Sequence, residues 1–192
     1  LALGPALNGA GSVDARLAIL MPELERRIIG YRHYSRDLFG CFSFDAPDGA
    51  GQVKLHFIPD HSDAPTGPLH ASNRPARMAE LKEMFAHIRG THGETAKSVR
   101  GLSWLYHTRT YGSLFPQAFT DSLNPDPDPA LPQGMRYWGQ FLTHRGHLKT
   151  ETAEPFLAGL HQLDLGRLPD AFPYAPLQAI APICAFYRHL GL

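Results

Sequence analysis

The chain has 192 residues, with 18 Lys and Arg against 18 Asp and Glu, so its formal net charge is zero. This balance lacks the excess of positive charge on which nucleic-acid and anionic membrane binding depend, and we expect neither partner. No apolar stretch approaches the 18 or so residues that a membrane helix needs. Cys41 and Cys184 lie far apart and form no CxxC. We therefore expect no disulfide framework and no cysteine zinc site, and we predict a cytoplasmic protein.

The beginning of the chain predicts a flexible lead-in over residues 1–12, followed by one domain over residues 13–192. Apolar residues then recur at spacings of three and four from Leu17 to Ile28, which is typical of one helix face. We expect that helix to end at Gly30, with a kink or break at Pro22.

A pair of strands, a helix and a third strand come next. Residues 38–44 and 53–58 flank a turn-rich segment and predict an antiparallel hairpin. Residues 75–89 carry an apolar stripe, with Pro75 in the first turn and a glycine beyond the end, which predicts a helix. Residues 98–106 carry apolar side chains at odd and at even positions, so both faces of a strand would be apolar, which indicates a central strand.

The remaining elements complete a mixed α+β domain with a central sheet flanked by helices. We expect short helical segments before and after Pro116, and a surface loop in the proline-rich residues 124–132. Residues 135–143 predict a strand. Thr150 or Thr152 is expected to cap a helix whose Phe156, Leu160 and Leu163 point inward. A C-terminal helix with Cys184 in the core is predicted by the spacing of Leu177, Ile180, Cys184 and Tyr187.

The end of the central strand is the first candidate site. Tyr106 and His107 lie where this strand runs into the Thr108–Tyr111 segment, at the start of a helix that could hold an anion. Tyr106 would donate a proton, His107 would act as base, and Arg109 would clamp an anion. In the alternative interpretation, Trp104 and Tyr106 are core aromatics, and His107 and Arg109 form a solvated rim.

The 11 histidines suggest a second kind of site. His56 with His61, and His144 with His147, could bring two imidazole pairs to a metal, with Asp60 as an oxygen ligand. Neither pair has the HExxH arrangement, so scattered surface histidines are the better explanation, and we expect no metal. The chain also lacks G-x-S-x-G, G-x-G-x-x-G and P-loop motifs, which disfavours a serine hydrolase and the usual nucleotide sites.

Five short motifs occur in an order that resembles a known group of proteins. They are LHFIP at residues 55–59, GPL at 67–69, GLSWLY at 101–106, LFP at 114–116 and WGQF at 138–141. The order resembles bacterial acyltransferase-like domains related to the GNAT (N-acyltransferase) superfamily, in which LHIP, GPL, SWLL, YLP and FQ segments follow one another. The resemblance covers roughly residues 53–160.

This resemblance implies a mixed sheet that splays at its middle, where an acyl thioester such as acetyl-CoA enters. It implies direct acyl transfer to an amine, with Tyr106 or Tyr111 as the acid and His107 or His56 as the base. Arg109, Trp104 and Thr108 would then bind the cofactor. The Q/R-x-x-G-x-G/A loop that binds pyrophosphate in ordinary GNAT enzymes does not occur in this chain.

Three functions follow as hypotheses. The first is an acyl-CoA-dependent N-acyltransferase acting on a small-molecule amine. The second is a non-catalytic module that binds a small molecule or protein in an aromatic cleft near Trp104, Tyr106, Tyr111 and Trp138. The third is a metal-dependent hydrolase that uses the histidines.

Overall fold

The computed structural model describes residues 15, 18, 37–58, 66–125, 135–159 and 170–192. The chain divides into two compact units, residues 1–36 and 37–192. In the first unit, Ala15 and Ala18 are helical. The predicted lead-in and the prediction of a first helix that ends at Gly30 otherwise lie outside the described residues.

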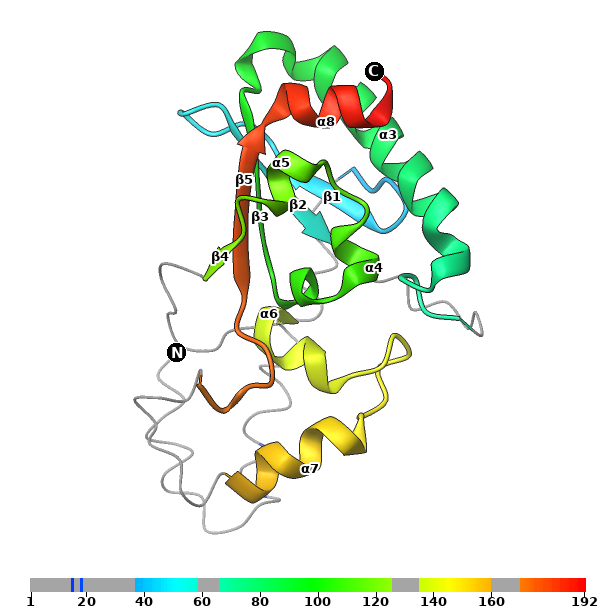
Figure 1. Ribbon diagram of the computed structural model, residues 1–192, viewed down its shortest axis with the longest axis vertical. Coiled ribbons are helices and arrows are strands. Elements are labelled where there is room, and N and C mark those ends of the chain that lie inside the picture. Colours follow the sequence, from blue (N-terminus) through cyan, green and yellow to red (C-terminus); the bar gives the residue numbers. More distant parts are fainter. Residues whose placement is uncertain (1–14, 16–17, 19–36, 59–65, 126–134, 160–169) are drawn as a thin grey trace. The chain divides into compact units, whose positions relative to one another are not determined.

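The second unit contains a mixed five-stranded sheet in the order β1-β2-β3-β5-β4 (Figure 1). Its strands are β1 (Phe42–Asp45), β2 (Gln52–Phe57), β3 (Ser98–Ser103), β4 (Asn124–Pro125) and β5 (Leu177–Pro182). β1 and β2 form the predicted antiparallel hairpin, β2 and β3 are parallel, and β5 is antiparallel to both β3 and β4. The α+β class, the hairpin and the central position of β3 are therefore confirmed.

The turn of the hairpin is fixed by one carboxylate. Asp48 Oδ1 accepts hydrogen bonds from the backbone N–H groups of Ala50 and Gln52, each at 2.9 Å. These bonds favour the ionised carboxylate, and they lower the pKa of Asp48. The Asx-type turn explains why the Asp-rich, Gly-rich connection reverses the chain here.

The parallel pair is joined by α3 (Arg74–His92), which contains the predicted helix. A 3-10 helix η1 (Ala71–Asn73) precedes it, and η2 (Gly93–Thr95) follows. α3 ends where Gly93 adopts a φ of +50°, a conformation that residues with a side chain rarely adopt. Since α3 connects two parallel strands, its first turn follows the carboxyl end of β2.

The main core lies on one face of the sheet, which we call the apolar face; Val53, Leu55, Val99 and Ala179 belong to it. α3 and α8 (Ile183–Leu190) pack here, and Phe85 stacks on Phe186 with ring centroids 4.7 Å apart. The short helices α4 (Arg109–Gly112) and α5 (Gln117–Thr120) contribute further buried rings. Both were predicted around Pro116.

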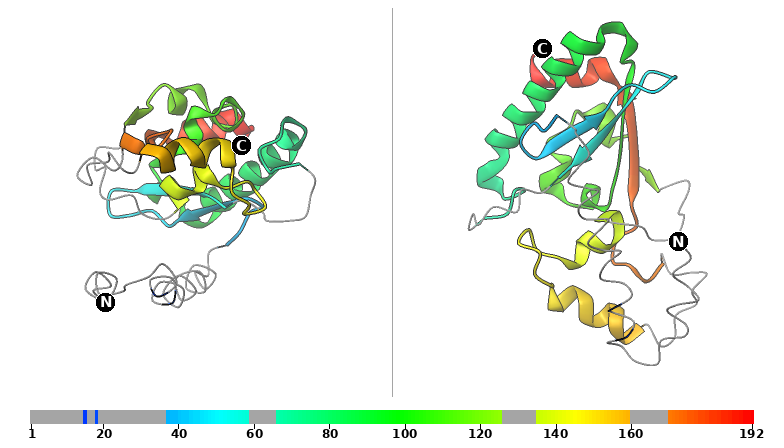
Figure 2. Two further views of the ribbon diagram at one scale, coloured as in Figure 1. Left: turned by 90° about the horizontal axis from the view of Figure 1, so that it is seen from below. Right: turned by 180° about the vertical axis from the view of Figure 1, so that it is seen from behind.

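The opposite face, which we call the polar face, has a different composition. The strand registers place the following side chains on it: Ser43, Asp45, Lys54, His56, Arg100, Leu102, Gln178 and Ile180. The rear view in Figure 2 shows β1 and β2, the strands that carry the first four of these residues. The two faces differ because the strands alternate polar and apolar residues with a period of two.

The chain segment that connects β4 to β5 forms a second, smaller aromatic cluster. Its helices are α6 (Met135–Trp138), the 3-10 helix η4 (Gly139–Phe141) and α7 (Thr150–Gly159), and its buried residues include Tyr137, Phe141 and Phe172. Phe156 packs on the cluster, as predicted. α7 begins at Thr150, so both threonines expected as caps lie inside the helix, and the capping prediction is wrong. Leu160 and Leu163 lie outside the described residues.

Four other sequence predictions are wrong in whole or in part. Residues 135–143 are mainly helical, because their aromatic rings pack on α7 and Phe172 instead of pairing in the sheet. The predicted C-terminal helix is a strand in its first half: β5 alternates buried Ala179 and Ala181 with exposed positions. Cys184 is exposed, since the α8 residues that face the core are others, such as Phe186. The predicted strand 98–106 ends at Ser103, where the 3-10 helix η3 (Trp104–His107) begins.

None of the described helices is long and apolar enough to cross a membrane.

Candidate functional site: an opening between parallel strands

β2 and β3 pair over only part of their length. Their parallel register runs from Gln52 beside Ser98 to Leu55 beside Gly101. Each strand then continues for two residues that pair only with its outer neighbour: His56 and Phe57 with β1, and Leu102 and Ser103 with β5. The sheet therefore opens between the carboxyl ends of its parallel pair, which is where open α/β sheets commonly bind ligands.

Two tyrosines close this opening on the apolar face. Tyr106 lies over Gly101, so that a Cβ at this glycine would overlap the Tyr106 hydroxyl. Tyr111 packs edge-on against Phe57, at a centroid distance of 5.3 Å, and its ring centroid lies 5.1 Å from that of Tyr106. Glycine is thus required at the last paired position because the phenol occupies the space of a side chain.

Burial in this apolar environment raises the pKa of both phenols. Tyr106 and Tyr111 are 7% and 2% exposed, and loss of solvation is the largest cause of each shift. The neighbouring Tyr111 phenol also raises the pKa of Tyr106.

On the polar face, a histidine and a carboxylate lie at the same opening. His56 follows the last residue of β2 that pairs with β3, and its Nε2 is 2.8 Å from Asp45 Oδ2. The side chains are 18% and 38% exposed. An aspartate that holds one ring nitrogen orients the imidazole and stabilises its protonated form. His56 is thus suited to act as a base.

A pocket of about 260 Å³ lies at the first turn of α3 and beside α4. Its walls combine apolar groups with three arginines and few other polar side chains: Leu69, His70, Ala71, Arg74, Arg77, Arg109, Thr110, Ser113 and Leu114. None of the described residues that line it is acidic, and most of its exposed wall is apolar. Arg74 and Arg109 give it positive charge, and its volume suits a phosphate or carboxylate group with a few neighbouring atoms.

Two of the arginines are exposed at the pocket. Arg74 Nη2 donates to the backbone oxygen of Ser113 at 3.2 Å, which joins the start of α3 to the end of α4. The Arg109 side chain has no hydrogen-bond or ion-pair partner within the described part of the chain. α3 has no acidic residue in its first turn, so no described residue at that position neutralises these cations.

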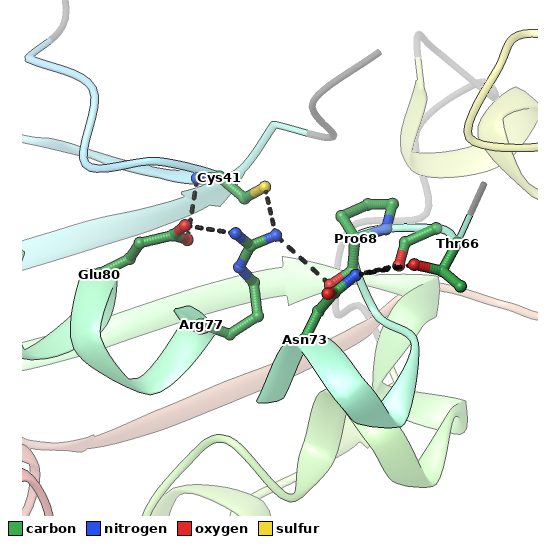
Figure 3. Close-up of polar contacts among 7 residues, drawn as sticks. Cys41, Thr66, Pro68, Asn73, Arg77 and Glu80 are labelled. Carbon is green, nitrogen blue, oxygen red and sulfur yellow. Dashed lines mark hydrogen bonds and ion pairs between the residues drawn. The ribbon is translucent and has the colours of Figure 1, made fainter. Parts of the chain in front are cut away.

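The third arginine is held from three sides (Figure 3). Arg77 bonds to the carboxylate of Glu80, and its Nη1 donates to Cys41 Sγ at 2.9 Å and to the backbone oxygen of Pro68 at 3.4 Å. Glu80 also accepts from the backbone N–H of Cys41 at 3.1 Å. Arg77 thus fixes the 66–73 loop, which forms one wall of the pocket, against α3 and the residue before β1.

The other predicted site residues are used in local packing. His107 Nε2 lies 2.9 Å from the backbone oxygen of Ala175, and its ring stacks on Tyr174. Trp104 also stacks on Tyr174, and the Thr108 hydroxyl donates to the backbone oxygen of Leu105 at 2.6 Å. Of the residues that the resemblance assigned, His56 lies at the opening on the polar face and Tyr106 and Tyr111 lie there on the apolar face, while Arg109 lines the pocket.

The aromatic cleft predicted for a binding module is divided between two regions. Tyr106 and Tyr111 belong to the main core, whereas Trp138 packs on Phe141, Phe156 and Phe172 in the smaller cluster. The rings therefore do not share one cleft within the described residues.

The predicted metal ligands are only partly described, since Asp60 and His61 lie outside the described residues. Among the residues that are described, no group of three or more His, Cys, Asp and Glu could hold a metal ion. His144 lies against Gly67, with Nδ1 3.2 Å from the position of a Cβ there.

Sequence reasoning missed Arg74 and Arg77. The available signal was two arginines three residues apart in the first turn of a helix that has no acidic residue there, an arrangement that the helix dipole disfavours unless an anion binds. The cross-strand neighbours of His56 could not be found, because they depend on register.

Comparison with known proteins adds no further assignment. No family model matches the chain, and no curated protein or solved structure matches it significantly.

Proposed function

We propose that the chain is an acyltransferase that moves an acyl group from a phosphorylated thioester, such as acetyl-CoA, to a small-molecule amine. The observation that carries the proposal is the opening at the carboxyl ends of β2 and β3, with an arginine-lined pocket on one side and the His56–Asp45 pair on the other face. A sheet that splays at its middle is also what the sequence resemblance implies.

The pocket suits the phosphate-bearing part of such a thioester. Arg74 and Arg109 supply guanidinium groups that bind phosphate oxygens, while Arg77 is already neutralised by Glu80 and keeps the wall in place. These side chains would replace the pyrophosphate loop that the sequence lacks. A volume of about 260 Å³ leaves the thioester end outside the pocket, toward Tyr111.

The reaction then needs one base. As the amine nitrogen bonds to the thioester carbonyl carbon, the His56 imidazole takes the amine proton and Asp45 stabilises the resulting imidazolium. The carbon–sulfur bond breaks, its electron pair stays on sulfur, and solvent supplies the proton of the departing thiol. Tyr111 is 2% exposed and belongs to the main core, so the acid role that the resemblance assigned to it is not part of this mechanism.

Binding is tested first, by titration calorimetry with CoA. We expect Arg109→Gln and Arg74→Gln each to weaken CoA binding about tenfold, which corresponds to one charged hydrogen bond or ion pair. Arg188→Gln, which removes an exposed arginine from α8, is the matched control and should bind CoA like the wild type. Failure of the wild-type chain to bind CoA would overturn the proposal.

Catalysis is tested by following thiol release from acetyl-CoA in the presence of a panel of amines. His56→Gln should lower the turnover rate by 10²-fold to about 10⁴-fold while CoA binding is retained, because only proton removal is lost. If CoA or a small carboxylate binds in an Arg109-dependent way and no amine supports thiol release, the non-catalytic binding module is the correct function.

A further inference from the structure

We propose that the polar face beside His56 binds the acceptor, and that the acceptor is a short amino acid whose amine faces His56 and whose carboxylate binds Lys54 and Arg100. This inference rests on the proposed acyl transfer, because it assigns the second substrate of that reaction.

The first observation is a pair of like charges. Lys54 and Arg100 are direct neighbours in the parallel register of β2 and β3, and both lie on the polar face. Cations on neighbouring strands repel each other unless an anion lies between them. Asp45 is opposite Lys54 on the other side, but its carboxylate is bonded to His56. Asp48, in the hairpin turn, interacts electrostatically with Arg100. Among the described residues, no carboxylate forms an ion pair with Lys54 or Arg100.

The second observation is independent of charge. Arg100 Nε is buried and has no hydrogen-bond partner among the described residues, and the same is true of Ser43 Oγ and Gln178 Oε1. All three atoms belong to the polar face. Ser43 is directly opposite His56, and Gln178 is opposite Leu102, where β3 has stopped pairing with β2. Buried donors and acceptors without partners are rare in folded proteins, and they mark this face as a surface that a polar ligand would complete.

The strand geometry sets the size of the acceptor. His56 and Lys54 are two residues apart on one strand and share a face, so their positions are separated by about 7 Å. His56 lies at the opening, and Lys54 and Arg100 lie farther from it. An amine at His56 therefore lies at the opening, while a carboxylate two to four bonds away reaches the two cations.

The experiment compares acceptors that differ only in the carboxylate. Glycine is paired with methylamine, β-alanine with ethylamine and γ-aminobutyrate with propylamine, and kcat/KM is measured by thiol release from acetyl-CoA. We expect at least a tenfold preference for the carboxylated member of the best pair. Lys54→Gln and Arg100→Gln should raise KM for that substrate and reduce the preference toward one, with CoA binding retained.

Lys82→Gln, which removes an exposed charge from α3, is the control and should keep the preference. The binding of each acceptor is also measured by calorimetry in the presence of CoA, so that a fault in catalysis does not obscure the result. Turnover of both members of each pair at equal kcat/KM would overturn this inference and leave the acyltransferase proposal intact. Absence of both CoA binding and thiol release would overturn both.

Discussion

On the apolar face of the sheet, the opening between β2 and β3 is closed by Tyr106 and Tyr111, and the surrounding rings belong to the main core. On the polar face beside His56, the buried Ser43 Oγ and Gln178 Oε1 have no hydrogen-bond partner among the described residues. Side chains of the main core thus fill the opening on the apolar face, whereas the polar face has buried polar atoms without partners among the described residues. This difference separates the residues that stabilise the fold from those available to bind a ligand.

The largest expected effect is on the apolar face. Phe85→Ala removes a fully buried ring that stacks on Phe186, and should reduce the free energy of unfolding by about 3–5 kcal/mol, measured by urea denaturation. Ile180→Ala on the polar face removes a side chain that is 39% exposed and should change it by less than about 0.5 kcal/mol. Equal losses in the two variants would show that the two faces do not differ in this way.

A smaller loss is expected from Gly101→Ala. The new methyl group would overlap the Tyr106 hydroxyl and lie 3.0 Å from Phe119 Cζ, so it should cost about 1–3 kcal/mol through overpacking. Tyr106→Phe removes the overlapping oxygen, and the cost of Gly101→Ala should be lower in that background, as measured by a double-mutant cycle. A cost that is unchanged by Tyr106→Phe would place the strain elsewhere.

The same tyrosines predict a loss of stability at high pH. Because their pKa values in the folded chain are raised above the unfolded value near 10, the folded state retains protons that the unfolded state loses. The free energy of unfolding should be insensitive to these phenols below about pH 9. It should then fall by about 1.4 kcal/mol per pH unit for each tyrosine above pH 10.

The measurement is urea denaturation from pH 8 to 11. Tyr106→Phe and Tyr111→Phe should each make the alkaline decrease less steep, whereas Tyr174→Phe, which alters an exposed tyrosine, should not. If all three variants have the wild-type slope, the buried phenols do not cause the decrease.

The sequence predicted those elements whose pattern is local. The alternation of residues 53–57 and the apolar stripe of α3 identified the hairpin and the long helix, because each face of these elements meets one environment. β5 was missed because its buried positions are the small Ala179 and Ala181, which carry little hydrophobic signal. The helical segment at residues 135–141 depends on contacts with Phe156 and Phe172, which are distant in sequence.

The candidate site was predictable to a similar extent. His56, Tyr106, Tyr111 and Arg109 were named from motifs, and the structure places them around the opening or the adjoining pocket. The partner of His56 could not be predicted, because Asp45 reaches it only through the register of the hairpin. Trp104 and His107 were misleading for a related reason: the ring that occupies their exposed faces, Tyr174, comes from a distant segment.

The most direct test of the central claim is a titration of the ¹⁵N-labelled chain with CoA, followed by amide chemical shifts. Binding at the opening predicts the largest shifts in residues 55–58, 69–77 and 101–113, which form the strand ends, the loop and first turn of α3, and α4. The absence of shifts at millimolar CoA, or shifts confined to α7 and the smaller aromatic cluster, would contradict the account.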